Sequence, residues 1–547
     1  MRMVLTTSNR LAALVLAVTS LGFSSAGSQK SFGPTLESAR ENGLQIFNSV
    51  HDAMRQFGSS LHHNGMSLYP GVIPKGVLLY HGTHTKEIPK GSEWLAFEIE
   101  HAEGFARGGP PGPGPGPNHT DGRTHRGPRG PPMGMAMQDG HHPPDRPPRS
   151  REPGHLHIYQ AVRPLNVLYI DGMAAGKTDA GTTDTQDILL LGNKSHDGWE
   201  ERSRADKLCI LAQDWKIDGF IRMEPGFEII YCDFTDGLKL LSANKRPAMD
   251  NPGSEDSNGI SGFEWARAAS QRYNDIGSSR VILDYSSVVS AFFYPINLTN
   301  PDPKRPELPR LIGASSEELD VVREHVAESI ARSISHLQSP IDWQGVSDMI
   351  VTRYVKRLPF IAQTDSIDII KAELNGLLNI YIDYAETDVG FAGARQRCAE
   401  FFLQPVQPRT SEDKLVYAAF EKTTSTICAA LFKAREIVIE DPDADEPVAM
   451  HATKQIIGSL VKSLGWSNFK DCGVCKADEV CFIAMWPMGN IEDHYSPSCL
   501  NYTAMGHGRN SYWRSLGGFP HGPPPQPSAC ADGQACGEHE DLGNEEL

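Results

Sequence analysis

The sequence predicts an α+β N-terminal domain of short mixed and antiparallel strands with helices, followed by an all-α helical domain and a small disulfide-rich C-terminal module. Short apolar runs bounded by turn residues alternate with a few helical patterns before residue 245. From Leu319 onward, apolar residues recur at intervals of three or four. Four cysteines then cluster between residues 472 and 499. A length of 547 residues is consistent with two or three such domains.

The N-terminus has the pattern of a secretory signal peptide. Arg2 and Arg10 supply positive charge, residues 11–21 are apolar, and Ser24-Ser25-Ala26 offers small residues for cleavage. We therefore assign residues 1–26 to the signal peptide and expect a secreted protein without a transmembrane helix, since the apolar run is too short to span a bilayer. Four sequons are glycosylation candidates in a secreted chain, at Asn118, Asn193, Asn297 and Asn501.

The charge balance bears on the partners of the protein. The formal net charge is −17 at pH 7. Nucleic-acid binding needs a basic surface, so we expect no nucleic-acid partner. An unknown protein partner remains compatible with this composition.

Residues 27–245 are predicted to form the α+β domain. An amphipathic helix near residues 46–57 should stop at Gly58. Residues 108–154 are rich in Pro, Gly and His and are expected to be a disordered insertion within this domain, because they cannot bury enough apolar surface to offset the entropy of ordering. A helix is expected near residues 200–215. An apolar strand from Leu78 should end in a polar turn that carries His81, and a second short strand from Glu93 should lead into a short helix. Further strands are expected at residues 155–162, 167–170, 219–222 and 227–232.

The helical domain is predicted over residues 261–465, after a polar linker at 246–260. Its strongest signal begins at Ser315-Ser316-Glu317-Glu318, which resembles a capping box, and continues as an apolar repeat to Leu337. Residues 281–296 form a mixed stretch before it. Further helices are expected near residues 343–357, 366–384, 390–403, 411–436 and 451–464.

The cysteines suggest a disulfide framework. The cysteine-rich module covers residues 466–516, and an acidic tail at 517–547 is expected to be disordered. Four thiolates of this module could hold zinc, but an oxidising compartment favours two disulfides, with a connectivity that the sequence leaves open. Cys398 and Cys428 lie on two successive predicted helices and could tie them together if these helices run antiparallel. The disulfide candidates are Cys209, Cys232, Cys398, Cys428, Cys472, Cys475, Cys481, Cys499, Cys530 and Cys536.

Several common motifs are excluded by their spacing. In the stretch from Asp171 to Thr178, the first glycine of a phosphate loop would fall on Asp171, whose charge opposes phosphate. The chain contains neither a G-x-S-x-G elbow nor an H-E-x-x-H helix. His81 and His84 lack a third ligand nearby, so no metal site is predicted.

Three short segments resemble the motifs of a known family. They are Leu79-Tyr80-His81-Gly82-Thr83, His101-Ala102-Glu103-Gly104-Phe105-Ala106 and Phe227-Glu228-Ile229-Ile230-Tyr231. In this order they resemble ADP-ribosyltransferases of the histidine–tyrosine–glutamate type, which include poly-ADP-ribose polymerases and RNA 2′-phosphotransferases. The family's middle triad residue would fall near Trp94 to Ala96, where this sequence has neither Tyr nor Ser; Ser92 lies just upstream.

The resemblance implies a site for NAD as the substrate, with Glu228 and His81 as catalytic residues. Glu228 would stabilise the positive charge that develops on the ribose when the glycosidic bond breaks. His81 would bind another ribose hydroxyl, Gly82 and Thr83 would line the cofactor site, and Phe105 would stack on nicotinamide. This arrangement requires His81 and Glu228 to face one cleft, within reach of a single ribose.

Other interpretations remain open. The transferase-like domain is either active or degenerate, and the chain is alternatively a non-enzymatic secreted surface or host-interaction protein. An extracellular hydrolase with an unrecognised site is a third alternative. If the motifs arise by chance, His81 caps a strand and Glu228 is a solvated residue at a sheet edge.

Overall fold

The computed structural model describes residues 32–106, 153–192, 201–247, 260–335, 341–385, 391–440, 445–506 and 511–513. Residues from Gly33 onward form one compact unit. The predicted signal peptide, the insertion at 108–154 apart from its last two residues, and the acidic tail lie outside the described residues. So do the candidates Asn118, Asn193, Cys530 and Cys536.

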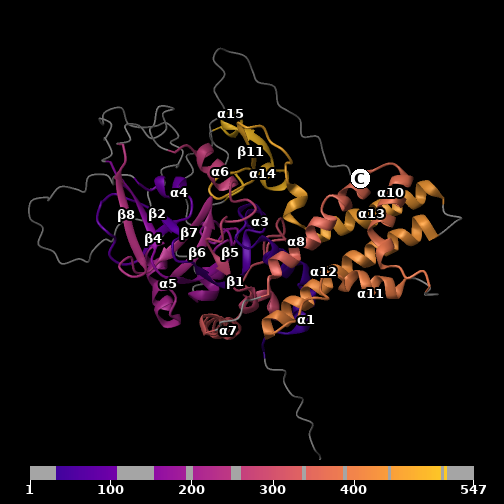
Figure 1. Cartoon of the computed structure of the whole chain (residues 1–547), viewed down its shortest axis with the longest axis horizontal. Coiled ribbons are helices and arrows are strands. Elements are labelled where there is room, and N and C mark those ends of the chain that lie inside the picture. The colour runs from indigo at the N-terminus through magenta and orange to yellow at the C-terminus, as the bar shows by residue number, and fades with distance from the viewer. Residues whose placement is uncertain are drawn as a thin grey trace, which may run out of the picture. The chain divides into compact units, whose positions relative to one another are not determined.

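One sheet dominates the N-terminal part. Its strands lie in the order β10-β1-β5-β6-β7-β3-β2-β4-β8, with β9 also paired to β1 (Figure 1). The β5–β6 pair is parallel, and the other pairs described are antiparallel. The strands are β1 (Asn64–Ile73), β2 (Leu78–Thr83), β3 (Glu93–Ala96), β4 (His155–Ala161), β5 (Leu165–Gly172), β6 (Gly219–Glu224), β7 (Gly226–Tyr231), β8 (Leu238–Lys245), β9 (Ile282–Leu283) and β10 (Val289–Ser290).

The first helical segment differs from its prediction. The chain forms α2 (Gly43–Asp52) and α3 (Gln56–Leu61) instead of one helix ending at Gly58. The break lies at Met54, whose φ of 58° is left-handed and interrupts the helical backbone. Because α3 continues through Gly58, the expectation that this glycine ends the helix is wrong. Gln56 of α3 then donates to the Glu224 carbonyl and accepts from the Gly226 amide, and so holds the β6–β7 turn.

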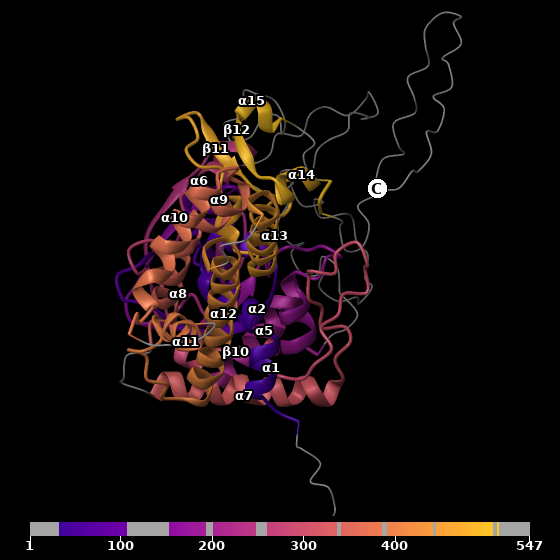
Figure 2. The same cartoon turned by 90° about the vertical axis from the view of Figure 1, so that its right-hand side faces the viewer.

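The helical region around α12 consists mainly of α8 to α13 together with α1 and α2, whereas α6 packs on α4 and the C-terminal module (Figure 2). The predicted capping box is present, since Ser315 and Glu318 exchange side-chain-to-backbone hydrogen bonds at the start of α7. The helices are α1 (Leu36–Glu41), α4 (Ile99–Glu103), α5 (Glu201–Trp215), α6 (Gly262–Ser270), α7 (Ser316–Ser335), α8 (Trp343–Tyr354), α9 (Arg357–Gln363), α10 (Ile367–Leu378), α11 (Ala392–Glu400), α12 (Ser411–Arg435) and α13 (Glu446–Leu464), with short turns η1 (Thr185–Leu190), η2 (Tyr285–Ser287), η3 (Ala291–Phe293), η4 (Asn379–Tyr381), η5 (Glu436–Glu440) and η6 (Ser467–Lys470).

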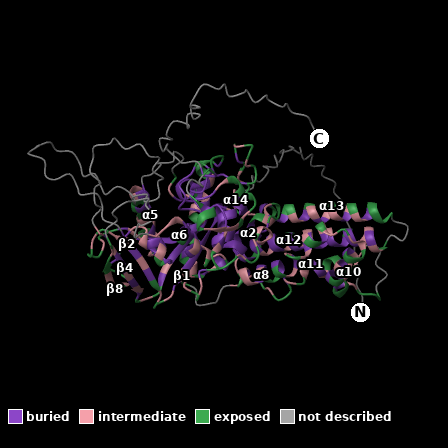
Figure 3. Cartoon of the chain, turned by 90° about the horizontal axis from the view of Figure 1, so that it is seen from above, coloured by how far each residue is buried: buried purple, intermediate pink, exposed green. Residues whose placement is uncertain are grey.

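Aromatic packing joins the helical region to the N-terminal helices. Phe420 of α12 lies 4.7 Å from Phe47 of α2 and 5.0 Å from Trp343 of α8, measured between ring centroids. Helix α12 is mostly buried, whereas α13 exposes one face (Figure 3). In addition, β9 and β10 come from the predicted mixed stretch at 281–296 and pair with β1. The α+β and helical parts therefore share one body, and the domain boundaries at 245 and 465 remain predictions.

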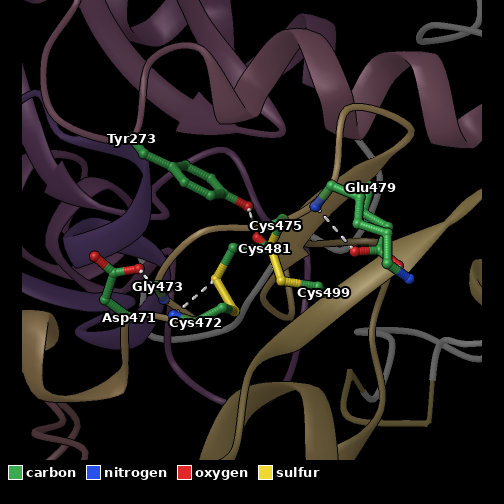
Figure 4. The surroundings of a disulfide bond; sticks show 9 residues. Tyr273, Asp471, Cys472, Gly473, Cys475, Glu479, Cys481 and Cys499 are labelled. Carbon is green, nitrogen blue, oxygen red and sulfur yellow. Dashed lines mark hydrogen bonds and ion pairs between the residues drawn. A yellow bond between two sulfur atoms is a disulfide. The ribbon is translucent and has the colours of Figure 1, made fainter.

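The C-terminal module is cross-linked by two disulfides, Cys472–Cys481 and Cys475–Cys499 (Figure 4). It contains β11 (Glu479–Phe482), β12 (Ser498–Asn501), α14 (Ile491–Tyr495) and α15 (Tyr502–Met505). The Tyr273 hydroxyl, just after α6, donates to the Cys481 carbonyl and attaches the module to the rest of the chain. Two further disulfides join Cys209 to Cys232 and Cys398 to Cys428.

The structure confirms the predicted fold class and, for the eight cysteines among the described residues, the disulfide framework. Cys398 and Cys428 connect α11 to α12 as expected. In the part of the chain that the structure describes, none of the helices combines the length and apolar character needed to cross a bilayer.

The disulfide between α11 and α12 should contribute strongly to stability. It closes a sequence separation of 30 residues, against 9 for Cys472–Cys481. Because a longer closed loop restricts the unfolded chain more, Cys398→Ala/Cys428→Ala should lower the free energy of unfolding by about 3.6 kcal/mol, and Cys472→Ala/Cys481→Ala by about 1 kcal/mol less. Urea denaturation followed by circular dichroism checks this, and the reverse order of the two variants would contradict it.

Candidate functional site

The register of three neighbouring strands decides which predicted site residues can meet. Tyr80 of β2 lies opposite Ala96 of β3, and Ala96 lies opposite Glu228 of β7. Residues directly opposite one another project from the same face of a sheet, and successive residues alternate. Glu228 therefore shares a face with Tyr80 and Gly82, whereas His81 and Thr83 project from the other face. The expectation that His81 and Glu228 face one cleft is wrong in this structure.

The surroundings of His81 agree with this placement. Its Nδ1–H donates to the Trp94 carbonyl over 2.7 Å, and its ring packs against His157 and Phe234. Burial lowers the pKa of His81 to about 4, so the imidazole is neutral at pH 7. Its Nε2 has no hydrogen-bond partner among the described residues. Thr83 follows on β2, opposite His155.

The other face gathers Gly82, Phe105 and Glu228 around α4. A Cβ at Gly82 would lie only 2.0 Å from the Ala102 carbonyl oxygen, so the missing side chain lets α4 pack directly on β2. Phe105, just past α4, is half-buried, with its ring 5.4 Å from that of His101. His101 Nε2 lies 3.8 Å from Glu228 Oε2. His101 thus connects α4, which contains the second of the family-like motifs, to Glu228 of the third motif.

Glu228 is a buried member of a charge network, not a solvated residue at a sheet edge. It is 5% exposed, and Arg222 of β6 contacts its Oε1. Arg222 also pairs with Glu201 Oε1 at 2.6 Å and donates to Gln186 Oε1 at 2.9 Å. Burial alone would raise the pKa of Glu228, but the charges of Arg222 and the neighbouring His101 lower it to about 2. Glu228 is therefore ionised across the physiological range.

The network continues on both sides of Glu201. Arg204 joins Glu201 Oε2 to Asp187, with distances of 2.8 Å and 2.7 Å. Lys177 Nζ lies 3.5 Å from Glu201 Oε2 and lies over the Trp486 ring. All these charged side chains are buried. The stretch from Asp171 to Thr178, excluded as a phosphate loop, thus brings Lys177 to the same network.

Glu224 and His101 complete this cluster. Lys177 Nζ lies 3.6 Å from Glu224 Oε2, and His101 Nε2 lies 3.6 Å from Glu224 Oε1. The His101 Nδ1–H donates to the Pro225 carbonyl over 2.8 Å. Burial raises the pKa of Glu224. Burial would lower the pKa of His101, but Glu228 and Glu224 raise it to about 9.

The arrangement offers a fixed, buried carboxylate beside a cationic imidazole and a second carboxylate of raised pKa. Such groups can stabilise developing positive charge or bind a cation. His101, Glu224 and Glu228 also form a group whose ligand atoms lie within 4.8 Å of one another, a metal-type cluster that the sequence did not predict. The available signal was the presence of Arg222, Glu224 and Glu228 in strands that are otherwise apolar.

The charge on His101 should make stability depend on alkaline pH. A histidine whose folded pKa is raised stabilises the fold fully below pH 6.5, and this contribution is lost as pH rises through about 9. Between these values the free energy of unfolding should fall by on the order of 3 kcal/mol more in the wild type than in His101→Gln. Urea titrations at several pH values measure the difference, with His84→Gln in an exposed turn as the control. Parallel pH profiles for wild type and His101→Gln would contradict it.

Comparison with known proteins finds similarity without an assigned activity. Residues 36–252 match the family model of the YPL277C N-terminal domain, which spans α1 to β8. The chain is 27% identical over 538 residues to uncharacterized protein YOR389W of Saccharomyces cerevisiae, covering 83% of each chain. It is 34% identical over 218 residues to uncharacterized protein YPL277C of the same yeast, covering 37% of this chain and 43% of the relative. No solved structure matches significantly.

Proposed function

We propose that the protein is secreted and that its N-terminal domain acts on NAD at Glu228, as an ADP-ribosyltransferase-like domain. The observation that carries this proposal is the placement of Gly82, Phe105 and Glu228 on one face of the sheet around α4. Glu228 would stabilise the ribosyl cation formed when the bond to nicotinamide breaks. Phe105 would contact the nicotinamide ring.

The opposite orientation of His81 changes its proposed role. Its Nδ1–H holds the Trp94 carbonyl, on the strand between β2 and β7. His81 would therefore act as a positioning residue for β3 and would not bind the ribose that Glu228 contacts. The proposal therefore differs from the resemblance, which implies that His81 and Glu228 both contact the ribose.

The nicotinamide released from NAD tests this role. The wild type should release nicotinamide faster than the buffer blank, and Glu228→Gln should reduce the rate by about a hundredfold or more through loss of electrostatic stabilisation. His81→Asn should reduce the rate of nicotinamide release less than Glu228→Gln does, because His81 projects from the opposite face of the sheet. Glu264→Gln, at an exposed position on α6, is the matched control. Circular dichroism and thermal unfolding show whether each variant is folded.

The outcomes separate two functions. Equal rates for the wild type, Glu228→Gln and the blank would exclude NAD cleavage. The second candidate function, a non-enzymatic secreted surface or host-interaction protein, would then stand. It is favoured by one specific observation, namely that Arg222 and His101 already occupy the surroundings of the Glu228 carboxylate.

The proposal of secretion has separate support. Four disulfides, including Cys209–Cys232 and Cys475–Cys499, are expected to persist in an oxidising compartment. Expression in a secreting host should yield protein in the medium that begins at Gly27, because cleavage should follow Ala26. N-terminal sequencing of the secreted protein measures this, and protein retained in the cell with Met1 intact would contradict it. Asn297, exposed on a loop, and Asn501, half-buried at the end of β12, are the glycosylation candidates within the described residues.

A further inference from the structure

The buried cluster of His101, Glu224 and Glu228 has the arrangement of a cation site. His101 comes from α4, Glu224 ends β6, and Glu228 lies in β7, so three separate elements point ligand atoms at one position. The β6–β7 turn that sets the spacing of the two glutamates is held by Gln56. The three side chains are nine-tenths or more buried.

Each carboxylate directs one oxygen to a fixed cation and the other to His101. Arg222 contacts Glu228 Oε1, and Oε2 lies 3.8 Å from His101 Nε2. Lys177 lies 3.6 Å from Glu224 Oε2, and Oε1 lies 3.6 Å from the same Nε2. The Glu224 side chain is only 4% exposed, and the ion-pair distances from Lys177 and His101 to its oxygens are both 3.6 Å, longer than an ordinary hydrogen bond. A buried carboxylate held at such distances leaves room for a closer partner between its oxygen and His101.

The distances suit a small divalent cation. Two ligands about 2.1 Å from a tetrahedral zinc ion lie about 3.4 Å apart. The observed separations of 3.6 Å and 3.8 Å from His101 Nε2 are within a few tenths of an ångström of that value. All three ligand atoms lie within 4.8 Å of one another, so side-chain movements of about an ångström would bring them onto one ion.

The imidazole is also oriented as a metal ligand usually is. Its Nδ1–H donates to the Pro225 carbonyl, which leaves Nε2 directed at the two carboxylates. Metal-ligating histidines generally donate their other ring N–H to a carbonyl or a carboxylate, which fixes the tautomer and the ring orientation. Pro225 lies in the turn that connects the two glutamate strands.

We propose that His101 Nε2, Glu224 Oε1 and Glu228 Oε2 bind one first-row divalent metal ion, with Zn²⁺ as the probe. One nitrogen and two carboxylate oxygens favour such an ion over Mg²⁺ or Ca²⁺, which prefer oxygen ligands alone. Three protein ligands leave a coordination position for water. This site does not depend on the proposed reaction with NAD, since metal binding is measured without NAD.

Equilibrium dialysis of the EDTA-treated full chain against Zn²⁺, followed by elemental analysis, tests the site. The wild type should bind one high-affinity Zn²⁺ per chain, and Glu224→Gln should weaken this binding at least about tenfold. Glu224→Gln is preferred to Glu228→Gln because no hydrogen bond within the described structure is lost. The control is Glu264→Gln, which should bind like the wild type.

A spectroscopic measurement distinguishes this site from adventitious binding at the histidine-rich insertion, which contains His141-His142. Co²⁺ added to the wild type should give the visible absorption of a low-coordinate nitrogen and oxygen site, and Glu224→Gln should lose it while remaining folded. A His141→Ala/His142→Ala variant should keep it. Equal binding by wild type and Glu224→Gln, or no high-affinity binding by the wild type, would overturn the proposal whatever the nicotinamide assay shows.

Discussion

The burial of Arg222 is the constraint on which the N-terminal domain depends most. This guanidinium is 1% exposed in the middle of the sheet, so its charge must be matched by partners inside the protein. Glu228 comes from the adjacent strand, Glu201 from the start of α5, and Gln186 from η1. These contacts hold α5 and the buried turn η1 onto the sheet. Removing one partner of such a pair typically costs about 3–5 kcal/mol, because the other charge is left uncompensated.

The same contacts determine what Glu228 can do. Arg222 keeps the carboxylate ionised and directs one of its oxygens away from His101. The remaining oxygen faces an imidazole and a second carboxylate, at a position that suits a cation. A ribosyl cation and a divalent metal ion are two such cations. The NAD proposal and the metal proposal therefore depend on the same feature, which is the negative charge of the Glu228 carboxylate on the face of the sheet that α4 covers.

The helical region and the C-terminal module also support this face indirectly. Helix α12 packs through Phe420 on α2, and α3 follows α2 and holds the β6–β7 turn through Gln56. The strands β9 and β10 extend the sheet beside β1. Trp486 of the C-terminal module lies beneath the Lys177 ammonium. Segments more than two hundred residues apart in sequence thus meet around one charge network.

The sequence by itself determined the fold class and most of the strands and helices, because apolar periodicity is a local pattern. It made Cys398 and Cys428 candidates for a disulfide, but only the packing of α11 against α12 brings their two sulfur atoms together. It did not determine the break at Met54, the pairing of β9 and β10 with β1, or the cluster of His101, Glu224 and Glu228. Most decisively, it could not show that His81 and Glu228 project from opposite faces. Side chains alternate along a strand, so a single residue of register decides the face, and only the pairing of β2, β3 and β7 in the tertiary structure sets that register.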